Sequence, residues 1–283
     1  MWDDAWTSVR HTHRMAVETG ENPWPGMFDQ IADQYDQSGV PWFGPIARGL
    51  VELLEPRPGE RFLELGPGRG ALTVPLARAV GADGRVDALD MAPSMVRLLR
   101  EDLEGRGVTN VSVAVGDASD PRPPDTAYDG VASSLVLFFL PDPVAGLVAW
   151  HRLLRPGGRA GIATFQPWAG RFAELLGLVA EYAGPPERGG TAFDTDEGVE
   201  QLFRAAGYSD VRTVPRTFPI PFLDLDQWHT WSQATALRRV WTDTDPAQHA
   251  EILERAGDIL DAARDSDGRI VLDIGIRYTL ASR

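Results

Sequence analysis

The segment that most constrains this chain of 283 residues is Phe62–Gly70, with the sequence FLELGPGRG. Its apolar start predicts a buried strand, and the residues after it predict a helix that opens at Ala71 and reaches about Val80. Glycines in the turn let a ligand approach the backbone where a Cβ would collide. The helix start behind them has unpaired backbone N–H groups. The segment therefore predicts a ligand-binding loop at the end of a strand.

The spacing of Gly66, Gly68 and Gly70 limits which ligand this loop can bind. A dinucleotide fingerprint needs G-x-G-x-x-G, whereas this chain has G-x-G-x-G, so the spacing argues against NAD. A P-loop needs a lysine after its glycines, and the chain contains no lysine. Glu64, two residues before the first glycine, would repel a pyrophosphate and attract an ammonium or sulfonium group. The pattern favours a ligand that carries positive charge.

With Glu64 in place, the segment resembles motif I of the class I S-adenosylmethionine (SAM) methyltransferases, E/D-x-G-x-G-x-G. The resemblance points to the small-molecule branch, which is UbiE-like and includes methyltransferase types 11 and 25. It implies SAM as the cofactor and S-adenosyl-L-homocysteine as the product. It also implies that Glu64 lies near the methionine amino group while the loop of Gly66, Gly68 and Gly70 wraps the cofactor.

Asp90 ends the second predicted strand, Gly84–Asp90, and follows Gly66 at the spacing of a nucleoside-binding unit. A carboxylate at this strand end can accept hydrogen bonds from both ribose hydroxyls. Met91, the next residue, is then expected beside the adenine. Taken alone, Asp90 is explained equally well as a cap for the helix that begins near Pro93. Its register with the glycine loop favours the cofactor role.

Two further strand ends follow in the same order. The third predicted strand ends at Asp117, which the resemblance places at the adenine amino group, with the Ala118 backbone facing the ring. By itself, Asp117 is typical of a loop aspartate. The fourth predicted strand, Tyr128–Leu137, carries Ser133 and Ser134 beside the glycine loop, where strand order reverses and ligands bind. We expect these serines to contact SAM or the acceptor.

Residues 1–45 are predicted to form an N-terminal helical cap. Within them, Phe28–Asp36 has the apolar spacing of a short amphipathic helix, which packing alone can explain. The segment also resembles an F-D-x-x-A-x-x-Y-D element that covers the methionine end of SAM, which implies a cofactor contact for Tyr35. His11 and His13 lie two positions apart and would point about 200° apart on a helix, so they cannot chelate a metal together. No metal site is predicted.

The alternation of strands and helices predicts an α/β fold with a Rossmann-like sheet. Residues 46–165 are expected to form the SAM-binding core, and residues 166–195 a lid insertion. Residues 196–283 are expected to complete the core, with a helical insert at 221–267. The resemblance implies a seven-stranded sheet of order 3-2-1-4-5-7-6, flanked by helices, whose last strand is antiparallel.

Tryptophans are frequent in the second half of the chain, where substrate choice is expected to reside. Trp228 and Trp231 share one face of a predicted helix, and such a stripe is usually part of the core. The alternative is an aromatic-walled acceptor pocket, because aromatic faces favour a cationic sulfonium. Candidate pocket residues are Trp42, Trp168, Phe172, Trp228 and Trp231.

Composition limits the partners. The net charge of −14 disfavours nucleic acid, because phosphate binding requires a basic surface. The sequence contains no cysteine, which removes disulfides and thiol catalysis. No apolar run approaches 18 residues and no signal-peptide pattern opens the chain, so we expect a cytoplasmic protein without a membrane partner. Its partner is expected to be a small-molecule acceptor. The sequence does not decide between a monomer and a homodimer.

SAM already carries an activated methyl group, so the protein mainly has to align the acceptor with the S–CH₃ bond and exclude water. We therefore expect in-line methyl transfer to oxygen, nitrogen or carbon of a small, hydrophobic metabolite, such as one of secondary metabolism. A base is optional, and the candidates are His11, His13, Tyr35 and His229. No triad or carboxylate pair selects one of them.

Three other hypotheses remain open at this point. The chain could bind SAM and catalyse cyclisation or rearrangement without methyl transfer, with the sulfonium as a fixed charge. It could also be a non-catalytic SAM-binding protein that retains the fold. An NAD-linked oxidoreductase is the third, which the glycine spacing disfavours.

Overall fold

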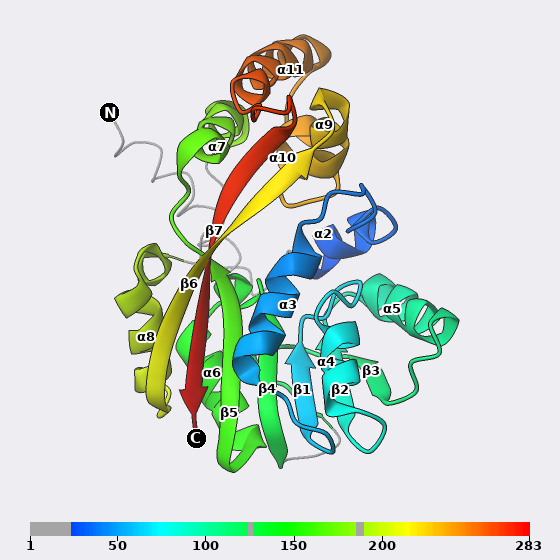
Figure 1. Ribbon diagram of the computed structural model, residues 1–283, viewed down its shortest axis with the longest axis vertical. Helices are drawn as coiled ribbons and strands as arrows, with labels where there is room; N and C mark the ends of the chain where they lie inside the picture. The colour runs from blue at the N-terminus through cyan, green and yellow to red at the C-terminus, as the bar shows by residue number, and fades with distance from the viewer. Residues whose placement is uncertain (1–23, 124–126, 185–189) are drawn as a thin grey trace.

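The computed structural model describes residues 24–123, 127–184 and 190–283. A seven-stranded sheet of order β3-β2-β1-β4-β5-β7-β6 forms the centre of the protein (Figure 1). Strands β1 to β5 pair in parallel, and β7 runs antiparallel to both of its neighbours. This arrangement confirms the predicted fold class and strand order.

The strands alternate with helices through the first half of the chain. The strands are β1 (Arg61–Leu65), β2 (Arg85–Asp90), β3 (Val111–Val115), β4 (Tyr128–Ser134), β5 (Leu154–Phe165), β6 (Ser209–Phe222) and β7 (Ile270–Ser282). The helices are α2 (Trp24–Ile31), α3 (Phe43–Leu54), α4 (Thr73–Val80), α5 (Pro93–Gly105), η1 (Leu137–Phe139), α6 (Pro143–Leu153), α7 (Gly170–Ala183), η2 (Thr191–Asp194), α8 (Asp196–Ala205), α9 (Leu225–Gln233), α10 (Arg238–Thr242) and α11 (Pro246–Asp261).

Strand β4 is shorter than its predicted range of Tyr128–Leu137. It ends at Ser134 because Leu135 adopts a left-handed backbone with φ of 62°, after which η1 begins. A non-glycine residue in this conformation is uncommon and costs backbone energy. The prediction of a longer strand was wrong because the apolar run continues past the point where the backbone turns.

Helix α2 begins and ends earlier than predicted. The expected helix was Phe28–Asp36, whereas α2 ends at Ile31 and the following residues form turns. Asp36 has a φ of 58°, which a continuing right-handed helix does not allow. Tyr35 therefore reaches its position from a turn.

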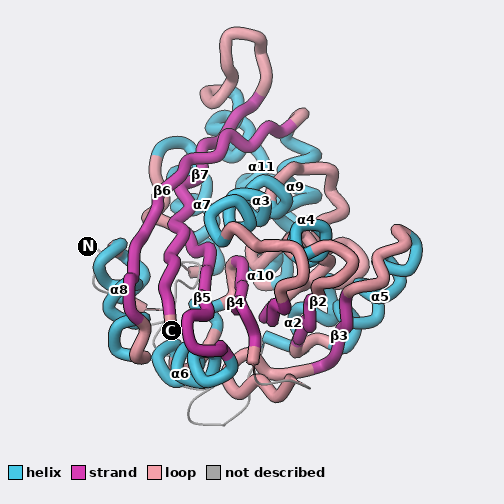
Figure 2. Tube along the Cα trace, turned by 60° about the horizontal axis from the view of Figure 1, so that its bottom comes forward, coloured by secondary structure: helices cyan, strands magenta, loops and turns pink. Residues whose placement is uncertain are grey.

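Helices cover the sheet on both faces. Helix α3 packs on β5 and β7, α4 packs on β2, and α5 packs on β2 and β3. Helix α6 packs on β5, and α8 packs on β6 and β7. Figure 2 shows the two groups of helices on either side of the strands. Among the described residues, none of the helices combines the length and apolar character needed to span a membrane.

The outer halves of β6 and β7 extend beyond the other strands and carry a group of helices at the top of Figure 1. Helix α7 packs against β7, α10 and α11, and α9 packs against β6, α10 and α11. These helices come from the segment after β5 and from the segment between β6 and β7. Two distant parts of the chain thus meet next to the carboxyl ends of the central strands.

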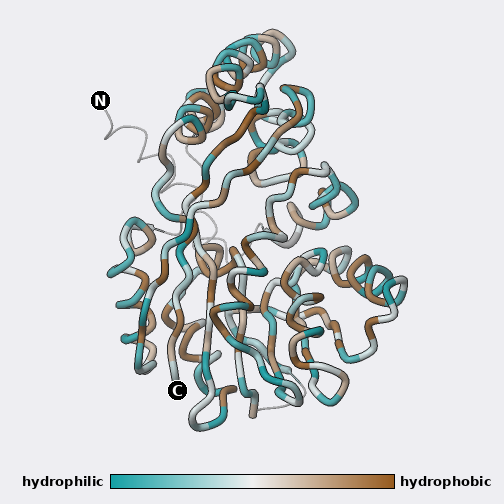
Figure 3. The backbone as a smooth tube through the Cα atoms, in the orientation of Figure 1, coloured by the Kyte–Doolittle hydropathy of each residue, from teal (hydrophilic) through white to brown (hydrophobic). Residues whose placement is uncertain are grey.

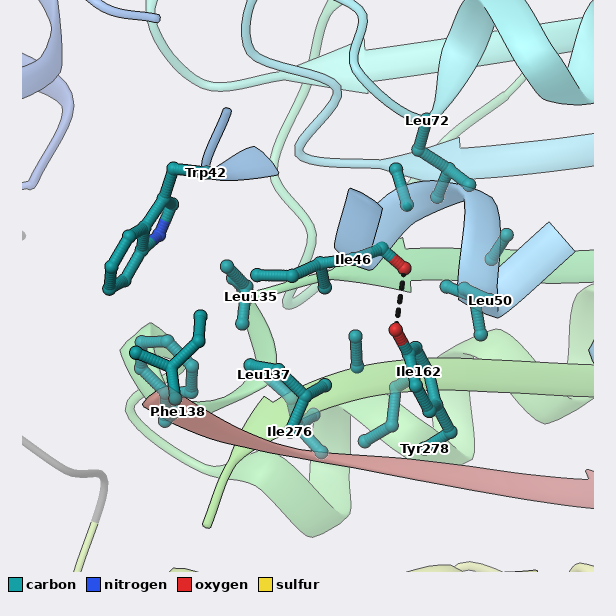
Figure 4. Packing of buried hydrophobic residues seen from close by; sticks show 14 of the residues in the cluster. Trp42, Ile46, Leu50, Leu72, Leu135, Leu137, Phe138, Ile162, Ile276 and Tyr278 are labelled. Atoms are coloured by element: carbon teal, nitrogen blue, oxygen red, sulfur yellow. Dashed lines mark hydrogen bonds between the residues drawn. The ribbon is translucent and has the colours of Figure 1, made fainter. Parts of the chain in front are cut away.

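The core lies between the sheet and its helices. Figure 3 shows that hydrophobic residues recur along both the strands and the helices. Trp150 and Tyr278 are fully buried. The Tyr278 hydroxyl donates a hydrogen bond of 2.8 Å to the Ile46 carbonyl and joins β7 to α3 (Figure 4). The Trp150 indole N–H donates to the Ala118 carbonyl at 2.6 Å. The polar atoms of these two buried aromatic residues thus connect β7 to α3 and connect α6 to the segment that follows β3.

Strand β6 forms one edge of the sheet and contains three prolines. Pro215, Pro219 and Pro221 pair with Arg277, Asp273 and Val271 of β7. Proline has no N–H to donate, so these positions cannot belong to the hydrogen-bonded pairs of the antiparallel ladder. Their nitrogen atoms therefore face the free edge.

Gly130 allows β4 to pack against Phe62, and its substitution by alanine is expected to destabilise the fold. A Cβ at this position would lie 2.1 Å from Cε1 of Phe62, whose side chain is fully buried. We expect Gly130→Ala to cost about 1–3 kcal/mol through overpacking, measured as a lower urea midpoint. Gly177→Ala is the control, because a Cβ there meets nothing within 4 Å on helix α7. Equal midpoints for the two variants would contradict this explanation.

Candidate functional site

The glycine loop after β1 is fixed by backbone conformations that favour glycine. Gly66 has a φ of 69°, and its N–H donates to the Leu89 carbonyl at 2.9 Å. A Cβ on Gly66 would lie 2.3 Å from Cγ2 of Val136. Gly68 has a φ of 52°, and its N–H donates to Asp90 Oδ2 at 3.0 Å. The loop is thereby attached to the end of the neighbouring strand β2.

Asp90 is held by backbone donors on both carboxylate oxygens. Oδ1 accepts a hydrogen bond of 3.0 Å from the Ala92 N–H, and Oδ2 accepts the one from Gly68. Burial raises the pKa of this carboxyl above its ordinary value, while the Ala92 and Gly68 donors act in the opposite direction. Each carboxylate oxygen has a second lone pair. A diol can therefore be bound at a carboxylate whose orientation is already set.

Glu64 is a buried carboxyl beneath the loop, with 1% of its surface exposed. Its Oε2 atom has no hydrogen-bond partner among the described residues. Burial raises the pKa of the Glu64 carboxyl to about 8, and the negative charge of Asp90 adds to the shift. A buried carboxyl with an unpaired oxygen is costly and is characteristic of functional sites. A cationic group bound nearby would favour its ionised form.

The segment around α2 covers the glycine loop. A Cβ on Gly68 would lie 3.5 Å from Cε1 of Tyr35, which is ordinary van der Waals distance, so the Tyr35 ring lies close beside the loop backbone. Arg69, in the loop, binds Asp102 of α5 through Nε at 3.0 Å and Nη2 at 2.8 Å. Its Nη1 donates to the Ala32 carbonyl at 3.1 Å. The loop, the cover and α5 are thus joined by one guanidinium group.

Beside this loop lies a cavity of about 770 Å³, counting the open space at its mouth, which we name the glycine-loop cavity. It brings together most of the predicted cofactor residues, namely Tyr35, Gly66, Gly68, Asp90, Met91, Asp117, Ala118 and Ser134. The remaining lining residues are Trp24, Phe28, Leu89, Ala92, Met95, Gly116, Leu135, Val136, Phe139, Leu140 and Pro141.

Three predicted cofactor residues lie outside the lining. Glu64 lies beneath the loop. Gly70 packs against α5, since a Cβ there would lie 2.6 Å from Cδ1 of Leu99. The buried Ser133 hydroxyl donates to the Leu65 carbonyl at 2.8 Å and links β4 to β1. Side chains alternate along a strand, so Ser133 and its neighbour Ser134 point to opposite faces.

The sequence reasoning missed Leu135, Val136 and Phe139, which line the same cavity. They follow β4, where the left-handed Leu135 directs the chain across the mouth of the glycine loop. Apolar side chains are as typical of a continuing strand as of a pocket wall, so the sequence does not distinguish the two. Gly116 was missed too, although a glycine immediately before Asp117 is a usable signal of close approach.

A second cavity of about 1100 Å³, again counting its open mouth, adjoins the first, and we name it the aromatic cavity. Four predicted pocket residues line it, namely Trp42, Trp168, Phe172 and Trp231. The other lining residues are Trp24, Phe28, Tyr35, Phe43, Leu135, Phe138, Phe139, Phe165, Leu176, Val179, Ala183, Gly184, Thr235, Ala236, Leu237, Arg239 and Val240. Figure 4 shows Trp42, Leu135 and Phe138 grouped at one end of the core cluster.

Trp228 is not among the residues that line either cavity. It is 1% exposed and packs edge-on against Trp241 at 6.2 Å between ring centroids. Trp231 instead packs against Trp42 at 4.6 Å. The two tryptophans therefore differ in position although they lie three residues apart on α9, since Trp231 lines a cavity and Trp228 does not.

The two cavities share Trp24, Phe28, Tyr35, Leu135 and Phe139. These residues lie where the two cavities adjoin, so a ligand in one cavity would be next to a ligand in the other. Tyr35 is packed between rings, stacked on Phe43 at 4.8 Å and edge-on to Phe28 at 5.9 Å. A shared aromatic wall keeps water away from reacting groups.

The candidate bases lie in different places. His229 packs on Trp241 at 4.3 Å, and its Nε2 lies 3.0 Å from Nε2 of Gln233, away from both cavities. Burial, and then the charge of His249, lower the pKa of His229. Tyr35 lines both cavities, but burial raises the pKa of its phenol. Its hydroxyl is therefore a hydrogen-bond donor at neutral pH. His11 and His13 lie outside the described residues.

The glycine-loop cavity fits SAM. The unpartnered Oε2 of Glu64 suits an ammonium group, and Asp90 suits a ribose diol. Apolar side chains from Leu89, Met91 and Leu140 provide a surface for a planar base. A sulfonium placed at the shared aromatic wall would face ring surfaces that favour positive charge.

Comparison with known proteins agrees with this geometry. Residues 62–158 match the family described as a methyltransferase domain. The chain is 33% identical over 242 residues to nocamycin O-methyltransferase from Saccharothrix syringae, covering 80% of this chain and 86% of that protein. It is 41% identical over 148 residues to aklanonic acid methyltransferase DauC from Streptomyces sp. strain C5, covering 52% of this chain and 67% of that one.

Among solved structures, the YcgJ protein from Bacillus subtilis has a TM-score of 0.58 with this chain at 15% sequence identity. The match covers 84% of this chain and 98% of that protein. At this identity the similarity concerns the fold alone.

Proposed function

We propose that this chain, which belongs to the class I SAM-dependent methyltransferases, transfers a methyl group to an oxygen atom of a small, ring-containing hydrophobic metabolite. The family is shown by the relative that is 33% identical over most of both chains. The chain is accordingly an enzyme that uses SAM to methylate a metabolite. What we propose is that the methylated atom is an oxygen and that the acceptor contains a ring system.

The observation that carries the proposal is the junction of the two cavities. The glycine-loop cavity holds the donor, and the aromatic cavity begins at the same residues, Tyr35, Leu135 and Phe139. An acceptor bound there lies next to the donor without a layer of solvent between them. The printed name of nocamycin O-methyltransferase, the relative with the longer match, supports oxygen as the methylated atom.

We propose the following roles for the cofactor residues. Glu64 stabilises the methionine ammonium group, and Asp90 accepts hydrogen bonds from the ribose hydroxyls. Met91 and Ala118 flank the adenine. Asp117, whose Oδ1 already accepts from the Ser119 N–H at 2.7 Å, offers its other oxygen to the adenine amino group.

SAM supplies an activated methyl group, and the residues of this chain position the acceptor and exclude water. The rings around the junction fill the space that water would take. The Tyr35 hydroxyl, whose pKa is raised by burial, can donate a hydrogen bond to the acceptor or to the donor. Leu135 enters the junction from its left-handed backbone position and limits how the acceptor can lie.

The test is to incubate the protein with SAM labelled at the methyl group and a panel of polycyclic phenols and carboxylic acids. We expect S-adenosylhomocysteine and an acceptor heavier by one labelled methyl group, detected together by mass spectrometry. Conversion of an acceptor without S-adenosylhomocysteine would support cyclisation or rearrangement instead. SAM binding without conversion of any acceptor in the panel would speak against this acceptor class.

We propose a small-molecule acceptor as the partner, without nucleic acid or membrane, for which the net charge of −14 is the support. A cytoplasmic location and a lid formed by residues 166–195 are part of the same proposal, and residues 185–189 lie outside the described residues. Analytical ultracentrifugation distinguishes monomer from homodimer.

A further inference from the structure

Three tryptophans of the described chain have a buried indole N–H without a hydrogen-bond partner among the described residues. They are Trp168, Trp228 and Trp231. Buried donors are nearly always paired, because leaving one unpaired loses the hydrogen bond that it makes with water in the unfolded chain. An unpaired donor on a residue that lines a cavity can be paired by a bound ligand, whereas the same donor away from a cavity cannot.

Two of the three line the aromatic cavity, and one does not. Trp168 and Trp231 are lining residues, whereas Trp228, which like Trp231 is buried, is not. Phe172 lies between the two lining tryptophans, at 5.2 Å from Trp168 and 6.4 Å from Trp231 between ring centroids. The two N–H groups therefore belong to one continuous aromatic wall.

Two of the other polar groups of this wall, on Thr235 and Arg239, are already paired within the chain. The Thr235 hydroxyl donates to the Ser232 carbonyl at 3.1 Å and accepts from the Leu237 N–H at 3.3 Å. Arg239 is half-exposed and is paired with Asp243 at 3.4 Å. The described lining thus keeps its charged group near solvent and leaves the indole N–H groups of Trp168 and Trp231 unpaired.

We propose that Trp168 and Trp231 are specificity-determining residues that donate hydrogen bonds to a carbonyl oxygen carried by the ring system of the acceptor. The proposal rests on the proposed function, since it assigns this cavity to the acceptor. Aromatic walls accommodate the flat faces of fused rings, and indole N–H groups are donors only, so they select an oxygen that accepts. A site built to bond such an oxygen rejects the analogue that lacks it.

Two probes isolate this contact. Fluorenone-2-carboxylate and fluorene-2-carboxylate share three rings and a carboxylate, and differ by a carbonyl group in place of CH₂. We expect the protein saturated with S-adenosylhomocysteine to bind the fluorenone at least about tenfold more tightly, measured by titration calorimetry. The comparison measures binding and does not require turnover.

Matched variants assign the effect to residues. Phenylalanine keeps a ring and removes the indole N–H, so Trp168→Phe and Trp231→Phe are each expected to reduce the preference for fluorenone. The double variant is expected to lose it, with less than about a twofold difference between probes. Trp228→Phe removes a donor that is equally unpaired but lies away from the cavity, and it should keep the preference.

The outcomes separate this inference from the function on which it rests. Equal affinity of the two probes for the unaltered protein would overturn it, as would a double variant that retains the preference. Loss of the preference in Trp228→Phe would equally contradict it. Melting temperatures and the affinity for S-adenosylhomocysteine show whether each variant is folded. Failure of the proposed function would appear separately, as absence of methylated product while the probes are still discriminated.

Discussion

Replacing Asp90 with alanine is expected to weaken SAM binding about 100-fold or more. The carboxylate is already oriented by the Gly68 and Ala92 N–H groups, at 3.0 Å each, so a diol finds its acceptors in place. Each hydrogen bond to a charged group contributes about 1.5–3 kcal/mol, and two of them account for the expected loss. Titration calorimetry with SAM and with S-adenosylhomocysteine measures it, and both ligands should lose affinity equally because both carry the ribose.

Two further variants show whether the effect is specific. Asp90→Asn keeps one acceptor oxygen and should fall between the unaltered protein and Asp90→Ala. Asp120→Ala removes an exposed carboxylate that is paired with Arg122 at 2.7 Å outside the cavity, and it should leave SAM affinity unchanged. An Asp90→Ala protein that melts normally and binds SAM within threefold of the unaltered protein would contradict the assignment of the ribose contact.

The affinity for SAM is expected to rise with pH because of Glu64. Burial raises the pKa of this carboxyl to about 8, so the free protein carries it protonated at neutral pH. An ammonium group bound beside it favours the carboxylate, and binding then releases a proton. Affinity should increase up to about tenfold between pH 6.5 and 7.5 and level off near pH 8, where the α-amino group of the ligand also begins to lose its proton. Calorimetry in buffers of different ionisation enthalpy measures the proton released.

Folding stability should change with pH in the opposite direction. Between the ordinary value of 4.5 and about 8, the folded free protein holds a proton on Glu64 that the unfolded chain has lost. Stability therefore falls as pH rises through this window, by up to about 1.4 kcal/mol per pH unit. The increase in melting temperature on adding SAM should accordingly be larger at pH 7.5 than at pH 6.5.

Glu64→Gln is the matched control, since it keeps the size and polarity of the side chain and removes the charge. Its SAM affinity should be nearly independent of pH and close to that of the unaltered protein at low pH. The pKa of Asp36, raised by burial to about 6, lies near this range, and a slope that survives in Glu64→Gln would point to that carboxyl instead.

The cofactor half of the site could be predicted because its candidate binding residues lie in short, recognisable sequence motifs. Gly66, Gly68, Asp90 and Asp117 each follow a strand, and parallel strands bring their carboxyl ends to one edge of the sheet. The structure gathers them around one cavity, as expected from that order. The roles of these residues toward SAM remain predictions.

The acceptor half depends on packing between distant segments, which local patterns do not specify. Trp228 and Trp231 are the same residue type on the same helix, and only the packing of Trp231 against Trp42 and Phe172 distinguishes the one that lines a cavity. The left-handed backbone of Leu135 has no signal in the sequence either, since leucine rarely adopts it. Ser133 was predicted to contact a ligand because it lies near the end of the fourth strand beside the glycine loop, whereas its hydroxyl donates to the Leu65 carbonyl.

The prolines of β6 affect whether two copies of this enzyme can pair through the edge of their sheets. An unprotected edge strand offers a row of N–H groups to another chain, and sheets can then continue from one molecule into the next. Pro215, Pro219 and Pro221 remove the donors from three of the four outward-facing positions between residues 215 and 221, and Thr217 keeps its N–H. An intermolecular ladder along β6 would lack its hydrogen bonds at these points, so the long strand that carries the acceptor-side helices is protected against aggregation through its own edge.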